Sequence, residues 1–136
     1  MSRVLVIDDD QIVRILLTAM LETGGYAVDI APDGRQALGI IEKAPPDVVI
    51  TDLVMPQMEG MEIIMTIQSI APEIPIVAMT GVSGGNLKYL QAARRLGAAE
   101  ILAKPVQREE LFAALERILP PDDAAPPPYP EPQPQA

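Results

Sequence analysis

Short runs of branched apolar residues alternate along the chain with longer segments in which apolar residues recur every three or four positions. The unbroken run at residues 4–7 is typical of a strand buried on both faces. Helical spacing across residues 12–23, ended by Gly24 and Gly25, predicts a helix. The alternation continues with strands at residues 26–31, 47–51, 76–79 and 100–103, and with helices from Asp33 to about residue 43, at about 61–69, up to residue 96 and at 108–119.

Five such repeats predict an α/β fold, a doubly wound parallel sheet with helices on both faces. Right-handed crossovers leave few topologies for such a sheet, and its binding site is expected at the carboxyl ends of the strands. A length of 136 residues fits one domain, which we place at residues 1–119. Residues 120–136 contain more than half of the prolines and no apolar periodicity, which predicts a disordered or polyproline-like tail.

Polar residues stand where the predicted strands end. Residues 8–10 are three consecutive aspartates after the first strand, and Asp52 follows the third. Thr80 follows the fourth strand, and Lys104 with Pro105 follows the fifth. Because parallel strands share one carboxyl edge, these groups are predicted to meet there.

Carboxylates gathered in this way repel one another unless a cation intervenes. Mg²⁺ prefers oxygen ligands and is often held by one or two carboxylates together with a phosphate. A carboxylate can also act as a nucleophile and form an acyl phosphate, and phosphoryl transfer needs mainly positioning and charge neutralisation. The pattern therefore indicates phosphoryl chemistry assisted by Mg²⁺.

Each feature also has a structural explanation when it is taken alone. The aspartates at 8–10 could cap the following helix, and Asp52 could begin a turn. Thr80 with Gly81 is a common turn signal, and Lys104 could be a solvated charge. The combination is more specific than its parts, because four strand ends carry the required groups in the required order.

The motifs VLVIDDD at 4–10, TDLVMPQMEG at 51–60, MTG at 79–81 and KP at 104–105 resemble those of response-regulator receiver domains of two-component signalling. The resemblance covers residues 3–119. It implies a flavodoxin-like fold with strand order 2-1-3-4-5 and five helices. It also implies that the chain is not an enzyme and catalyses only its own phosphorylation and dephosphorylation.

The resemblance implies a role for each acidic residue. Asp52 would be the phosphoacceptor. Asp9 and Asp52 would bind Mg²⁺ directly, Asp8 would act mainly through water, and the main-chain carbonyl of Val54 would complete the protein ligands.

The same resemblance assigns the remaining strand ends. Thr80 would be the switch hydroxyl, Lys104 would pair with the phosphoryl group, and the Lys104–Pro105 bond is expected to be cis. Ile101 departs from the family pattern, because many members have an aromatic residue there. We therefore expect the signal to travel through the Thr80 loop instead.

The resemblance also implies partners. The donor would be a phosphohistidine on a histidine kinase or a histidine phosphotransfer protein, which agrees with the absence of His from this chain. No effector segment follows residue 119, so we expect a stand-alone receiver. It would relay phosphate or bind a downstream protein through the face made by the fourth helix, fifth strand and fifth helix.

A net charge of −9 argues against nucleic-acid and anionic-membrane partners. The chain has no Cys, no signal peptide and no apolar run near the ~20 residues of a membrane span, so we expect a cytoplasmic protein.

Two other functions fit parts of the pattern. A pseudo-receiver would bind partners without being phosphorylated, although the complete set of acids, Thr and Lys argues against it. A haloacid-dehalogenase-like phosphatase would use residues 8–10 as its Asp-x-Asp motif, but it would leave Asp52 without a role.

Overall fold

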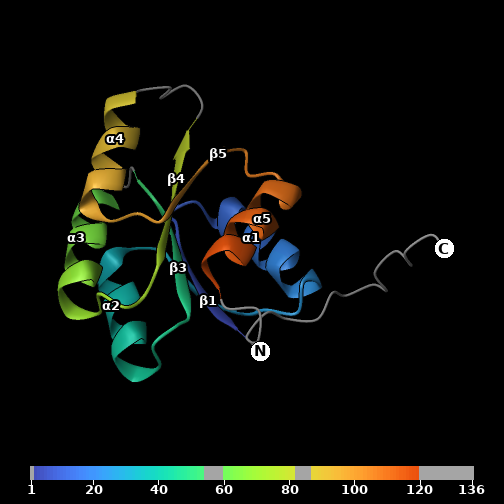
Figure 1. Ribbon diagram of the computed structural model, residues 1–136. Coiled ribbons are helices and arrows are strands. Elements are labelled where there is room, and N and C mark those ends of the chain that lie inside the picture. The colour runs from blue at the N-terminus through green and yellow to red at the C-terminus, as the bar shows by residue number, and fades with distance from the viewer. Residues whose placement is uncertain (1, 54–59, 82–86, 120–136) are drawn as a thin grey trace.

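The computed structural model describes residues 2–53, 60–81 and 87–119, with main chain only at 87–90. Strands and helices alternate along this part of the chain (Figure 1). The strands are β1 (Arg3–Ile7), β2 (Ala27–Ala31), β3 (Val48–Asp52), β4 (Ile76–Gly81) and β5 (Glu100–Lys104). The helices are α1 (Gln11–Thr23), α2 (Gly34–Lys43), α3 (Gly60–Ile70), α4 (Leu87–Leu96) and α5 (Arg108–Ile118).

The strands form one parallel sheet in the order β2-β1-β3-β4-β5, which confirms the predicted fold class and topology. Strand order reverses between β1 and β3, which are neighbours in the sheet although α1, β2 and α2 separate them in the chain. Ligand sites of doubly wound sheets lie at this reversal, beyond the carboxyl ends of the strands.

Helices cover both faces of the sheet (Figure 1), with α2, α3 and α4 on one face and α1 and α5 on the other. Leu5 and Ile7 of β1 pack in the core beneath α2 to α4, and Val4 and Val6 pack beneath α1 and α5. Because successive side chains of a strand point to opposite faces, the middle of a strand covered on both sides is apolar at successive positions. This burial on both faces explains the unbroken apolar runs.

Strands β3, β4 and β5 extend further than the apolar runs predict. Strand β4 continues to Gly81 and β5 to Lys104, so Thr80 and Lys104 lie within strands. Asp52 is likewise the last residue of β3. The backbone ladder persists because it depends on main-chain groups, whichever side chains they carry.

Several predictions concern residues outside the described ranges. These are the Val54 carbonyl ligand and the tail at 120–136. The domain boundary after residue 119 therefore stays a prediction. Within the described ranges, no helix has both the length and the apolar character to cross a lipid bilayer.

Candidate functional site

The three consecutive aspartates after β1 divide into two roles. Asp10 is the N-cap of α1, and its Oδ1 accepts a hydrogen bond from the Ile12 amide at 2.9 Å. Asp8 continues the strand direction, and its amide donates to the Ala31 carbonyl at 3.1 Å. The capping explanation is therefore confirmed for Asp10 alone.

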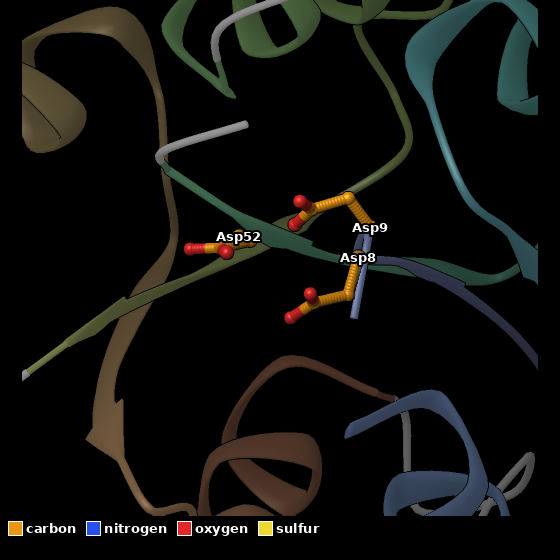
Figure 2. A group of neighbouring side chains, drawn as sticks. All are labelled: Asp8, Asp9 and Asp52. Atoms are coloured by element: carbon orange, nitrogen blue, oxygen red, sulfur yellow. The ribbon is translucent and has the colours of Figure 1, made fainter. Parts of the chain in front are cut away.

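Asp8, Asp9 and Asp52 gather at the carboxyl edge of the sheet. A carboxylate oxygen from each lies within 4.8 Å of the other two. Figure 2 shows Asp8 and Asp9 reaching from the end of β1 to the same side as Asp52 from β3. The register explains the meeting, since Ile7 pairs with Thr51 in neighbouring strands. Asp8 is fully buried and Asp52 is 7% exposed, whereas Asp9 is exposed.

Lys104 reaches this cluster from β5. Its Nζ donates to Asp8 Oδ2 at 2.8 Å and to Asp52 Oδ2 at 3.0 Å. Burial alone would lower the pKa of Lys104, but the hydrogen bonds to Asp8 and Asp52, with their negative charges, outweigh it and raise that pKa. The ammonium therefore remains charged at neutral pH and offsets part of the charge of the carboxylates.

Hydrogen bonds within the cluster leave Asp9 the most available carboxylate. Both oxygens of Asp8 have partners, because Oδ1 accepts from the Asp10 amide at 2.9 Å and Oδ2 from Lys104. In the described ranges, the Asp9 side chain makes no hydrogen bond or ion pair. Three hard oxygen donors facing one ammonium match the ligand preference of Mg²⁺, so the residues fit such an ion.

The other predicted site residues lie nearby but do not all join the cluster. Thr80 follows Met79, the ladder partner of Asp52, yet its hydroxyl makes no hydrogen bond to the carboxylates within the described ranges. The Lys104–Pro105 peptide bond is cis. Ile101 is partly buried and packs against the core on the side of α2 to α4.

Sequence reasoning missed Arg14. Its Nη1 donates to the main-chain carbonyl of Asp8 at 2.7 Å, which links the first turn of α1 to the acidic cluster. An Arg near the start of a predicted helix carries no distinguishing signal, because the same residue would ordinarily be a solvated charge.

Gly60 sets how closely α3 approaches β3. Its amide donates to the Leu53 carbonyl at 2.9 Å. A Cβ at this position would overlap the main-chain carbonyl of Asp52 and the Cα of Leu53. Glycine is required here because two backbones meet, and a backbone cannot turn aside as a flexible side chain can.

We expect Gly60→Ala to lower the free energy of unfolding by about 2 kcal/mol, because the added methyl forces the end of β3 to shift. Urea denaturation measures the change. Gly39→Ala in α2 is the matched control, since a Cβ there meets nothing within 4 Å. The control should be more stable than the parent by about 0.5–1 kcal/mol. Equal stability of the two variants would contradict the assigned role of Gly60.

A family profile described as "Response regulator receiver domain" matches residues 4–116. Among curated proteins, the response regulator MprA of Mycolicibacterium vanbaalenii is 37% identical over 126 residues. That match covers 90% of this chain and 54% of the relative. MprA of Mycobacterium leprae is 35% identical with the same coverage. The chain thus spans about half the length of the curated relatives it matches.

Solved structures of response regulator proteins are also similar to this chain. A response regulator receiver domain protein from Clostridium thermocellum superposes with a TM-score of 0.80 at 33% identity, covering 87% of this chain and 94% of that one. The chemotaxis protein CheY4 of Vibrio cholerae gives a TM-score of 0.79 at 34% identity, with 88% and 99% covered.

Proposed function

The chain belongs to the response regulator receiver domain family, and from this membership we propose that it accepts a phosphoryl group on Asp52. A carboxylate oxygen of Asp52 attacks the phosphorus of a phosphohistidine on a donor protein. A P–O bond forms, the P–N bond breaks, and the imidazole leaves with the electron pair and takes up a proton. The product is an aspartyl phosphate, a mixed anhydride.

One observation carries this proposal: three carboxylates and one ammonium from the ends of three strands converge on the edge of the sheet. Asp52 stands at the end of the central strand β3 with Lys104 3.0 Å away. Lys104 is placed to neutralise charge that accumulates on the phosphoryl oxygens. Thr80, at the adjacent end of β4, is proposed to hydrogen-bond those oxygens once the group is attached.

Mg²⁺ is the cofactor we propose for this site. When bound, it would neutralise the carboxylates and the incoming phosphoryl oxygens. Asp9 and Asp52 are proposed as direct ligands, with the Val54 carbonyl. Asp8 is proposed to act through water, which fits the hydrogen bond that each of its two oxygens already accepts.

We also propose two kinds of protein partner. A histidine kinase or histidine phosphotransfer protein supplies the phosphoryl group. A downstream protein binds the face formed by α4, β5 and α5. We do not propose that the receiver acts alone, because the matched relatives are about twice as long. The expectation of no nucleic-acid partner reflects only the charge of these 136 residues and stays a prediction, as does the cytoplasmic location.

The test is intact-mass analysis after incubation with acetyl phosphate and Mg²⁺. We expect one phosphoryl group per chain. A pseudo-receiver would show no gain in mass and would contradict the proposal. A phosphatase of the haloacid-dehalogenase type would instead turn over generic phosphate esters, which this chain is expected not to do.

Asp9→Asn is expected to abolish stabilisation by Mg²⁺, because it removes the carboxylate that has no other partner in the described ranges. The wild-type protein should gain about 2.7 kcal/mol of unfolding free energy at Mg²⁺ concentrations near 100 times the dissociation constant. The variant should gain little. Urea denaturation with and without Mg²⁺ measures both gains.

Asp10→Asn serves as the matched control, since Asn also caps a helix well and Asp10 lies outside the metal cluster. It should keep the gain from Mg²⁺. If Asp9→Asn retained the gain as well, Asp9 would not be a ligand.

A further inference from the structure

The carbonyl of Asp8 is a main-chain group that the sheet does not pair. Strand β1 ends at Ile7, so this oxygen lies beyond the ladder while its residue is fully buried. A buried carbonyl without a partner is costly, and Arg14 supplies the donor at 2.7 Å. A hydrogen bond from a guanidinium is stronger than one between neutral groups.

The charged guanidinium of Arg14 binds this main-chain carbonyl. In the described ranges, no carboxylate lies within ion-pair distance of its guanidinium. Its own amide is held by the Asp10 carbonyl at 3.1 Å in the first turn of α1, and its side chain is half-buried. The side chain thus joins the helix to the end of the strand across six residues.

The Asp8 carbonyl belongs to the peptide unit that connects Asp8 to Asp9. A peptide unit is planar and rigid, so holding its oxygen fixes the orientation of the Asp9 amide and restrains the Asp9 Cα. Asp9 has an exposed carboxylate with no side-chain partner in the described ranges. The direction of that carboxylate therefore depends on its backbone.

We propose that Arg14 is a positioning residue for the acidic site, which aims Asp9 at the cation by holding the Asp8 carbonyl. The inference rests on the proposed function, because Asp9 is a ligand there. Partners that orient ligands typically change metal affinity by 10- to 100-fold when they are removed.

A positioning role and a purely electrostatic role of Arg14 predict opposite changes in Mg²⁺ affinity when the residue is replaced. Arg14 carries a positive charge beside the carboxylates, so losing that charge alone would attract Mg²⁺ more strongly. Losing the hydrogen bond would instead release the turn and weaken binding. The direction of the change in affinity therefore separates the two roles.

The experiment measures Mg²⁺ affinity by calorimetry for the full chain and for Arg14→Met, which keeps most of the apolar stem without the donor. We expect affinity to fall about tenfold. Arg14→Lys retains a charged donor and should recover part of the loss. Arg35→Met is the charge-matched control, an exposed position on α2, and should bind Mg²⁺ as the parent does.

A second readout needs no metal. The amide nitrogen of Asp9 belongs to the same peptide unit as the Asp8 carbonyl, so its NMR resonance should move in metal-free Arg14→Met and move partly back in Arg14→Lys. If Arg14→Met fails to fold, Arg14→Lys must show both a displaced resonance and an affinity below that of the parent.

Parental or tighter Mg²⁺ binding by Arg14→Met would overturn the inference, as would parental affinity in Arg14→Lys where it alone folds. In either case the proposed function would stand. A wild-type chain that binds no Mg²⁺ would overturn both together.

Discussion

Asp52→Asn is expected to abolish phosphoryl incorporation while the protein remains folded. An amide is not a nucleophile toward phosphorus, so no acyl phosphate can form. The amide oxygen can still accept from Lys104, and one charge fewer relieves repulsion within the cluster. Intact-mass analysis after acetyl phosphate and Mg²⁺ should show one added phosphoryl group on the wild-type chain and none on the variant.

Asp47→Asn provides the control for Asp52. Asp47 lies at the opposite end of the sheet and accepts from the Arg3 amide at 2.7 Å, a role that an Asn oxygen can also fill. The control should be phosphorylated as the wild type is. Incorporation into Asp52→Asn at the wild-type level would assign the acceptor to another side chain.

Lys104→Met should destabilise the metal-free protein by about 3 kcal/mol. The ammonium contacts Asp8, which is fully buried, and Asp52, which is nearly so. Removing one partner of a buried ion pair leaves an uncompensated charge, and that loss typically costs about 3–5 kcal/mol. We take the lower end because the Lys104 side chain is 22% exposed. Urea denaturation at neutral pH measures the difference.

The difference in stability between wild type and Lys104→Met should depend on pH. Although burial opposes it, hydrogen bonds to Asp8 and Asp52 raise the pKa of Lys104 in the folded protein. Its stabilising contribution is therefore fully present below the unfolded pKa of about 10.4 and is lost as pH rises through the folded pKa. The difference in stability between wild type and Lys104→Met should stay constant from neutral pH to about 10 and shrink above that.

Lys43→Met is the control for this pair of measurements, since Lys43 is exposed in the last turn of α2. It should change stability by less than about 1 kcal/mol, the scale of a helix-dipole interaction. If Lys104→Met proved as mild as Lys43→Met, the ammonium would contribute little to the stability of the acidic cluster.

The fold could be predicted because the signals are local and repeated. Strands covered on both faces have unbroken apolar runs, as at residues 4–7 of β1 and 48–50 of β3, and Gly24 ends the first helix where the apolar spacing ends. Convergence of Asp8 and Asp52 follows from parallel strands alone, since their carboxyl ends share one edge.

The features that could not be predicted from the sequence depend on the positions of individual atoms. Spacing alone could not decide which of the three aspartates caps α1, because each is chemically suited to do so. The contact between Arg14 and the Asp8 carbonyl depends on a side-chain rotamer that no periodicity encodes. The strands extended through Thr80 and Lys104 because the ladder follows the backbone.

The crowding of Asp8, Asp9 and Asp52 around one ammonium has an evolutionary consequence. Functional sites often keep arrangements that lower stability, so repulsion of this kind persists where the proposed function needs it. Asp8 and Asp52 are paired with Lys104, so the exposed Asp9 is the member that a copy without the proposed function should lose first. Replacement of Asp9 by a neutral residue should raise the melting temperature of such a copy, because it removes repulsion without breaking an ion pair.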